Sequence, residues 1–311
     1  LPVTGFNGPL LAQQKPNEQA AQATAEQKQP NEGEDLFEMS LEELMEVPVV
    51  VSASRQEQKV TETSVPVSII TAEDIHYGGL TSIPEILRFA PGVDVLKFNR
   101  FTYAMGVRGL HDAISDRVQT LVNGRLADNS IFGGPEFYGL PIFLEDIDHI
   151  EIVRGPGGAA WGANAFTGVV NIITKKPEDM LGVFGSTTVN GFGDTYTHLR
   201  WAEKQGKWSW RISVGYEDVE SSEDAIDGTA SYESSMPALN GLMGFSSFVA
   251  RDFSRNLRFD SEAFYRASNM TEISFGVGHS HLEAGSFEHF GQFPQKNTRN
   301  DQVRSFAKID H

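Results

Sequence analysis

The second half of the chain alternates apolar and polar residues with a period of two. The alternation is clearest over residues 207–216, where every second side chain is large and apolar and those between are polar or glycine. This is the period of a β-strand with one apolar face. Weaker copies predict further strands at Val183–Val189, Thr195–Trp201, Leu242–Arg251, Leu257–Arg266 and Ile273–Val277, with a last strand starting near Val303.

The connections between these strands are unequal in length. Short turns at Gln205–Gly206 and Ser254–Asn256 bracket a long acidic loop over Asp218–Ala238. Turns at one end of the strands and loops at the other are typical of barrels that cross outer membranes. Asn269 predicts another short turn where a long loop is due. Alternation alone fits both a soluble sandwich, whose apolar face packs a core, and a barrel, whose apolar face contacts lipid.

The first half of the chain alternates short β-branched runs with short helices between Val49 and Pro177. Thr71 is placed as the N-cap of one helix, and a second helix starts at Ser82 with proline in its first turn and runs to Phe89. Strands are predicted at Val65–Ile70, Val118–Val122, Ile150–Val153 and Val169–Thr174, with a tight turn at Asn123-Gly124. The pattern predicts a small α+β domain of about 130 residues.

The chain begins with a polar segment. Residues 1–34 hold almost no large apolar residue after Leu11, so they bury too little surface to offset their ordering entropy, and we expect a flexible tail. Between Asp35 and Met45 apolar residues return at helical spacing. They predict a short amphipathic helix that stops at Pro48.

Composition narrows the possible classes of protein. The chain has 311 residues, a formal net charge of -17 and no cysteine. The acidic balance disfavours a nucleic-acid partner, and the lack of cysteine excludes disulfides, thiolate metal sites and thiol nucleophiles. No apolar run reaches the length of about 18 residues that a membrane-spanning helix needs. A barrel stays possible, because alternating strands raise mean hydropathy very little.

Three motifs in the α+β region resemble one known family. They are Ile83-Pro-Glu-Ile-Leu-Arg-Phe-Ala-Pro-Gly-Val93, Gly106-Val-Arg-Gly109, and the segment Ile150–Thr174, which contains Ile-Val-Arg-Gly-Pro-Gly-Gly and ends in Val-Val-Asn-Ile-Ile-Thr. In this order they resemble the plug domain of TonB-dependent outer-membrane receptors. The resemblance implies an α+β plug inside an antiparallel transmembrane β-barrel of about 22 strands. About seven strands fit after Pro177, so we expect an incomplete barrel and a chain that is the N-terminal part of a receptor.

The resemblance divides the chain into four expected parts. These are a disordered tail over 1–34, a short amphipathic helix and coupling segment over 35–48, the plug domain over 49–178, and the N-terminal strands of a truncated barrel over 179–311.

The resemblance also implies roles for individual residues. Arg108 and Arg154 match arginines that pair with carboxylates of the barrel wall and lock the plug; the alternative is that they are plain exposed arginines. The run Val47-Pro-Val-Val-Val-Ser52 resembles the segment that pairs as a strand with the energy-coupling protein TonB, with Val47, Val49, Val50 and Val51 as contacts. Alternatively, Val49–Val51 is the first strand of the plug, and the coupling segment lies upstream around Asp35–Met39.

Aromatic and glycine-rich loops are the expected ligand contacts. Two loops, Phe98–Tyr103 and Asn129–Tyr138, have tips of the kind that enclose a ligand. The candidate residues are Phe98, Arg100, Phe101, Tyr103, Phe132, Phe137 and Tyr138.

Other clusters have simpler explanations. Gly155-Pro-Gly-Gly158 lacks the lysine of a phosphate-binding loop, so we interpret these glycines as turn formers that allow close approach. Four acids, Glu145, Asp146, Asp148 and Glu151, would point apart on an extended segment, which favours a solvated or plug-to-wall role over catalysis. His279, His281 and Glu283 share one strand face and are weak metal candidates, although polar residues at a barrel rim explain the same spacing.

The sequence therefore predicts a transporter. We expect an outer-membrane receptor of a Gram-negative bacterium that imports a scarce large nutrient, such as a ferric siderophore or cobalamin, with energy from a periplasmic TonB-type protein. Its other contacts would be outer-membrane lipid, and we expect no catalytic residue, cofactor or nucleic-acid partner. The alternative is a soluble α+β domain joined to a β-sandwich that acts as a binding or adhesion module.

Overall fold

The computed structural model describes residues 49–53, 58–97, 103–110, 115, 117–127, 134–135, 137–191, 193–219, 253–268, 270–287 and 294–310. They belong to one compact unit, Pro48–His311. The predicted tail, the helix predicted before Pro48 and the strand predicted at Leu242–Arg251 lie outside the described residues. Among the helices described, none has both the length and the apolar character needed to cross a membrane.

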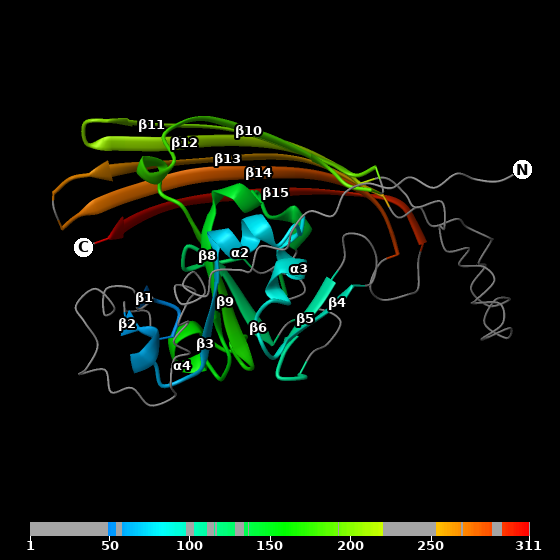
Figure 1. Cartoon of the computed structure of the whole chain (residues 1–311), viewed down its shortest axis with the longest axis horizontal. Coiled ribbons are helices and arrows are strands. Elements are labelled where there is room, and N and C mark those ends of the chain that lie inside the picture. Colours follow the sequence, from blue (N-terminus) through cyan, green and yellow to red (C-terminus); the bar gives the residue numbers. More distant parts are fainter. Residues whose placement is uncertain are drawn as a thin grey trace, which may run out of the picture. The chain divides into compact units, whose positions relative to one another are not determined.

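A five-stranded sheet forms the centre of the α+β domain (Figure 1). Its strands lie in the order β3 (Val67–Thr71), β8 (Ile147–Val153), β9 (Gly168–Thr174), β6 (Val118–Val122) and β7 (Arg125–Leu126). β6 and β9 are parallel, and the other neighbours are antiparallel. Asn123 and Gly124 both have positive φ, at 50° and 73°, as the predicted tight turn requires.

Short helices connect the strands. α2 (Ala72–Tyr77) starts at the N-cap predicted at Thr71. The cap is a capping box, in which the side chain of Thr71 accepts from the N–H of Asp74 while the carboxylate of Asp74 accepts from the N–H of Thr71. α3 (Ile83–Leu87) has proline in its first turn and ends two residues before the predicted limit at Phe89. The remaining helices are α4 (Gly158–Trp161) and the 3₁₀ turns η1 (Val60–Glu62), η2 (Phe137–Gly139), η3 (Leu144–Asp146) and η4 (Pro177–Asp179).

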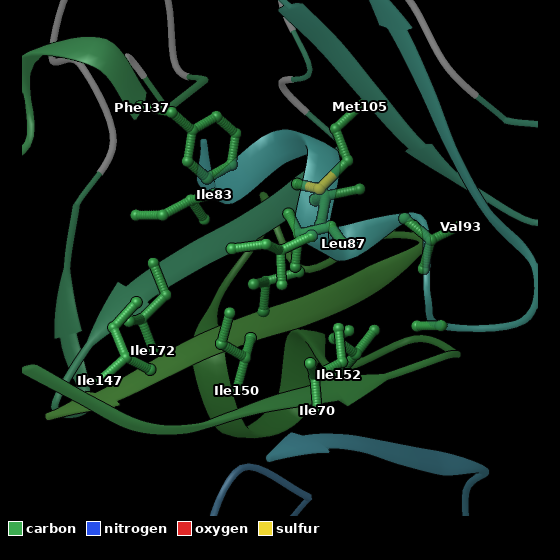
Figure 2. Packing of buried hydrophobic residues seen from close by; sticks show 14 of the residues in the cluster. Ile70, Ile83, Leu87, Val93, Met105, Phe137, Ile147, Ile150, Ile152 and Ile172 are labelled. Atoms are coloured by element: carbon green, nitrogen blue, oxygen red, sulfur yellow. The ribbon is translucent and has the colours of Figure 1, made fainter. Parts of the chain in front are cut away.

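The core of the domain lies between α3 and the sheet (Figure 2). Ile83 and Leu87 of α3 face Ile150 and Ile152 of β8, and all four side chains are buried. The core is closed by residues of the hairpin of β4 (Val93–Lys97) and β5 (Tyr103–Val107), including the buried Met105. The short pair β1 (Val49–Val50) and β2 (Gln58–Lys59) forms a separate two-stranded sheet.

A second, six-stranded sheet follows the α+β domain. Its antiparallel strands are neighbours in chain order, as the green to red arrows of Figure 1 show. They are β10 (Gly182–Val189), β11 (Thr195–Gln205), β12 (Trp208–Val219), β13 (Ser254–Arg266), β14 (Glu272–Phe287) and β15 (Pro294–Asp310).

The two faces of this sheet differ as the alternation predicts. On β12, Ser209, Arg211 and Ser213 are buried, at 8%, 1% and 0% exposure. The apolar residues between them belong to the opposite face, where Trp208 and Val214 are more than 40% exposed. The polar face of the sheet therefore contacts the α+β domain, and the apolar face is open in the described part of the chain.

One predicted turn and the bounds of one predicted strand are wrong. The turn expected at Ser254–Asn256 is the start of β13, and β13 pairs directly with β12, so no strand from residues 242–251 lies between them. The connection after β13, which contains Asn269, then falls at the same end of the sheet as the turn at Gly206. The apparent break in the pattern of turns and loops came from placing a turn at Ser254–Asn256, which belongs to β13. β14 is also far longer than Ile273–Val277.

Candidate functional site

The segment from η2 to η3 belongs to the α+β domain and contacts the six-stranded sheet. η3 presents three side chains to the sheet: the buried Phe143 that precedes it, Glu145 and Asp146. Their partners are inward-facing residues of β10, β11 and β12, which are neighbours across the sheet. A single 3₁₀ turn thus contacts three consecutive strands.

Asp146 has the most complete set of partners. Its Oδ1 accepts a hydrogen bond of 2.7 Å from Nη1 of Arg200, and its Oδ2 accepts one of 2.6 Å from Oγ of Ser213. The Nε atom of Arg211 lies 4.0 Å from the same Oδ2. Asp146 itself is 1% exposed. Of the two roles predicted for the acidic cluster, solvated or plug-to-wall, the position of Asp146 agrees with the second, because its carboxylate is buried against the six-stranded sheet.

Glu145 and Phe143 contact the adjacent positions. Ser186 donates to Glu145 at 2.9 Å, and Nδ1 of His198 lies 3.3 Å from the other carboxylate oxygen. Burial would raise the pKa of Glu145, but the partners His198, Ser186 and its own backbone N–H outweigh burial and lower this pKa to about 2. The ring of Phe143 stacks on that of His198 with 4.2 Å between centroids.

A charged network continues from this point along the sheet. Nη2 of Arg211 lies 2.6 Å from Asp260 and 3.3 Å from Glu262, and Arg304 pairs with Asp260 at 3.1 Å. Arg125 of β7 reaches Glu262 at 3.3 Å, so this network also joins the two parts of the chain. Buried charges are tolerated only when each has a partner of opposite sign.

The segment before η3 is held by hydrogen bonds to its backbone. The carbonyl of Tyr138 accepts from Nδ2 of Asn256 at 2.5 Å and from Arg258 at 3.4 Å. Arg258 is oriented by Glu217, which lies 2.5 Å away on β12. Together with η3, these contacts attach residues 137–146 to the sheet along their whole length.

A cavity of about 430 Å³ opens beside this segment. It lies at the end of the sheet where the longer connections leave, since Asn190, Tyr196 and Val219 line it. Three predicted ligand contacts, Tyr103, Phe137 and Tyr138, meet in its wall. The other predicted contacts, Phe98, Arg100, Phe101 and Phe132, lie outside the described residues.

Four of the five charged side chains that line this cavity form ion pairs, and the fifth, Asp194, accepts a hydrogen bond from Nδ2 of Asn190. Lys97 lies 2.8 Å from Glu85. Burial disfavours both charges, but the hydrogen bond between them outweighs burial, so the pKa of Glu85 is lowered and that of Lys97 is raised. Arg258 is held by Glu217 in the same way. The cavity therefore offers aromatic surface and hydrogen-bonding groups around neutralised ion pairs.

The predicted lock arginines have other surroundings here. Arg108 is exposed with φ of 58°, and Nη1 of Arg154 donates to the carbonyl of Pro91 at 3.0 Å. Within the described residues neither arginine has a carboxylate partner. Their pairing with a barrel wall stays a prediction.

The predicted coupling segment is part of the fold from Val49 onward. Val49 and Val50 form β1, and Val50 is fully buried. The N–H groups of Val51 and Ser52 donate to the carboxylate of Glu151 at 3.1 and 2.8 Å. This arrangement corresponds to the alternative in which Val49–Val51 is an internal strand. Contact of these residues with a coupling protein stays a prediction, and Val47 lies outside the described residues.

The histidine cluster on β14 forms cross-strand pairs. His281 lies 2.7 Å from Asp301 of β15 and His279 lies 3.7 Å from the same oxygen, whereas Glu283 pairs with Arg299 at 3.6 Å. No group of three metal-ligating side chains occurs in the part of the chain that the structure describes. The polar-rim explanation accounts for these contacts.

The interface was only partly visible in the sequence. The alternation places Arg211 and Ser213 on the polar face, but Arg200, Asp260 and Glu262 were not singled out. The alternation with a period of two could have found them, because each is a charged residue at an inward position of its strand.

The matches to known protein sequences fall mainly on the α+β domain. A model of the TonB-dependent Receptor Plug Domain matches residues 59–169. The vitamin B12 transporter BtuB of Vibrio cholerae serotype O1 is 36% identical over 145 residues, which are 47% of this chain and 23% of that protein. BtuB of Vibrio vulnificus is 33% identical over 136 residues, or 43% of this chain and 22% of the relative. The chain thus matches less than a quarter of the length of these relatives.

Solved structures extend the likeness into the second sheet. A mutant of the ferric enterobactin receptor PfeA of Pseudomonas aeruginosa gives a TM-score of 0.55 at 21% identity, covering 79% of this chain and 38% of that one. The alcaligin outer-membrane receptor FauA of Bordetella pertussis gives 0.55 at 19% identity, covering 76% and 35%. At these identities the likeness concerns the fold alone.

Proposed function

We propose that this chain, which contains the plug domain of a TonB-dependent receptor, is the N-terminal part of an outer-membrane transporter for a scarce nutrient. The relatives named for vitamin B12 transport and the receptors of similar fold make cobalamin and ferric siderophores the first ligand classes to test. No catalytic step is needed. The energy would come from a TonB-type protein in the periplasm of a Gram-negative bacterium.

The observation that carries this proposal is the arrangement of the six-stranded sheet around the plug domain. The inward face is polar and buried against the plug, with ion pairs across the contact. The outward face carries exposed large apolar side chains, with His279, His281 and Asp301 as polar residues toward the end where the longer connections leave. A soluble sandwich would cover the apolar face with a second sheet, so the alternative adhesion module is not favoured.

The outward face also has the height of a membrane. Its lower border is aromatic, since Trp208 and Tyr265 pack with 4.7 Å between ring centroids. Its upper border is a row of alternating charges across four strands, Asp218, Arg255, Glu283 and Arg299. From Trp208 to Asp218 a strand rises about 33 Å at roughly 3.3 Å per residue, or about 25 Å at a tilt of about 40°. The apolar band of outer-membrane barrels is about 25 Å tall.

The cavity supports a ligand site on the outer side. It lies at the end of the sheet where the longer connections leave, and such loops face outward in barrels of this kind. Tyrosine and phenylalanine side chains around paired charges fit a large ligand with apolar and hydrogen-bonding surface.

The test uses the receptor expressed from its complete gene in a strain that lacks its own cobalamin and siderophore receptors. Labelled cyanocobalamin and labelled ferric siderophores are offered in turn, with and without the energy-coupling protein. We expect surface binding in both strains and uptake only where the coupling protein is present. Uptake that is indifferent to the coupling protein, or a receptor found in the soluble fraction, would contradict the proposal.

A further inference from the structure

We propose that Asp146 is the residue that anchors the plug to the first strands of the wall, and that this anchor stays attached while the rest of the plug rearranges. The inference rests on the proposed transport function. It assigns a positioning role to a carboxylate of the plug and to arginines of the wall. In the lock expected at Arg108 and Arg154 the charges are placed the other way round, with arginines on the plug and carboxylates on the wall.

The first argument is the completeness of the contact. Arg200 and Ser213 satisfy one oxygen each of the Asp146 carboxylate, and all three residues are at most 9% exposed. Because these groups lie out of water, removing one partner leaves a buried charge without compensation. Removing one partner of a surface ion pair costs far less, so the buried position marks this pair as the one whose disruption should be felt most.

The second argument is the lack of space between the segment before η3 and the strands of the wall. A side chain at Gly215 of β12 would overlap the ring of Phe143, and one at Gly278 of β14 would come within 2.6 Å of Pro141. Glycine at these wall positions lets the segment before η3 lie directly on the strands. The wall is thus shaped for residues 141–146, and no water layer separates the two surfaces there.

The third argument is the continuity of the anchor with the wall itself. Arg211, next to Asp146, is bound by Asp260 and Glu262 of β13, and Arg304 of β15 pairs with the same two acids. Arg211, which lies beside the Asp146 carboxylate, is therefore fixed by other wall residues and cannot follow a departing plug. By contrast, the N-terminal strand β1 is only two residues long. A pull on the N-terminus meets the weaker attachment first.

The first experiment compares two variants in the complete receptor. Asp146→Asn and Arg200→Gln each remove one charge of the pair, and Asp179→Asn changes an exposed carboxylate of η4 as the matched control. Single-channel conductance in planar bilayers and sensitivity of cells to a large antibiotic report a loosened plug. We expect about a tenfold rise in leakage for the first two variants and none for the control, because a buried ion pair without one partner is strongly destabilised.

A double variant separates an anchor from a merely structural role. If the two residues act as a pair, Asp146→Asn with Arg200→Gln leaks no more than the worse single variant. Heat-modifiable migration in gels checks that the barrel itself assembles. Should Asp146→Asn fail to assemble, Ser213→Ala takes its place, since it removes one hydrogen bond and leaves every charge. Unchanged leakage in Arg200→Gln and Ser213→Ala would overturn the proposal.

The second experiment asks whether the anchor stays attached. The chain contains no cysteine, so Glu145→Cys and Ser186→Cys can be joined by a short thiol-specific cross-linker, because these side chains are in contact. We expect cross-linked receptors to keep uptake of whichever labelled nutrient the unmodified receptor imports. Retained binding with lost uptake would show that the anchor detaches, which overturns the inference and leaves the transport function standing. If the receptor shows no uptake even before cross-linking, the result contradicts the proposed function instead.

Discussion

Glu151 shows how one carboxylate organises the start of the plug. It is 1% exposed and accepts hydrogen bonds from the N–H groups of Val51 and Ser52 and from the hydroxyl of Ser52. Nε2 of His149 lies 3.3 Å from the same carboxylate, and the indole of Trp161 donates to the carbonyl of Ser52 at 2.7 Å. Residues 51–52 are thus held by a charge that burial makes costly to leave unpaired.

The charge on Glu151 makes this attachment depend on pH. Burial would raise its pKa, but hydrogen bonds from His149, Ser52 and Val51 outweigh burial and lower the pKa. For His149, burial is outweighed by Glu151 and Asp148, so its pKa is raised. The stabilisation from Glu151 is present above its unfolded pKa of about 4.3 and is lost as pH falls through the lower folded value. That from His149 is present below about 6.5 and is lost as pH rises through the raised value.

Glu151→Gln tests this attachment directly. We expect hydrogen-exchange protection of the Val51 and Ser52 amides to fall by about 10- to 100-fold, which corresponds to about 1.5–3 kcal/mol for hydrogen bonds to a charged group. In the wild type the same protection should decline on acidification below about pH 4, and in the variant this step should vanish. Asp148→Asn is the control, because Asp148 is exposed and touches only His149 of this cluster. Equal protection in all three proteins would refute the role of Glu151.

Single residues were the hardest level to predict from the sequence. Thr71, Pro84 and Asn123-Gly124 were recognised because capping and turn chemistry act between near neighbours in the chain. Asp146 stood among four acids, and only the fold shows that it meets Arg200 while Glu151 meets the backbone of Ser52. Such partners are distant in sequence, so local spacing carries no information about them.

Strands were predictable where one face is buried and the other is not. β12 gives the clearest alternation, because its inward residues face the plug and its outward residues are large and apolar. β14 was predicted too short, since glycines and histidines interrupt its alternation without interrupting its hydrogen-bonded pairing. Backbone pairing with two neighbours, which the sequence does not display, decides where such a strand ends.

Ile212 tests the outward face of the sheet. It lies near the middle of the apolar band, so Ile212→Lys should cost about 2–4 kcal/mol of assembly, whereas Gln205→Lys at the turn should cost about 0–1. The measurement is insertion of urea-denatured receptor into bilayers. An inward-facing position as such would tolerate a lysine. We nevertheless expect Ser213→Lys to insert poorly as well, because Ser213 is fully buried against Asp146. Equal insertion of the Ile212 and Gln205 variants would count against a lipid-facing sheet.

At the scale of the whole molecule, the plug is held at two places of different strength. Residues 137–146 contact all six described strands of the second sheet through buried ion pairs, hydrogen bonds and close packing. The N-terminal end is held by β1 and the carboxylate of Glu151. A force applied at the N-terminus would therefore act first on the smaller attachment. Under the proposed transport function, a pull would rearrange part of the plug without detaching the domain from the barrel.

The position of the coupling segment is the remaining test at this scale. Val50 is fully buried in β1, so Val50→Pro should disturb the plug and reduce ligand binding and uptake together. Phe37→Pro, in the upstream region that the sequence offers as the alternative, should keep surface binding of the labelled nutrient and lose its uptake, because a coupling segment contacts the partner and no ligand. Ala23→Pro in the predicted tail is the control and should change neither quantity. If Val50→Pro instead keeps binding and assembly while losing uptake, the strand at Val49–Val50 leaves the plug to pair with the coupling protein, and the segment predicted at Val47–Ser52 is the correct one.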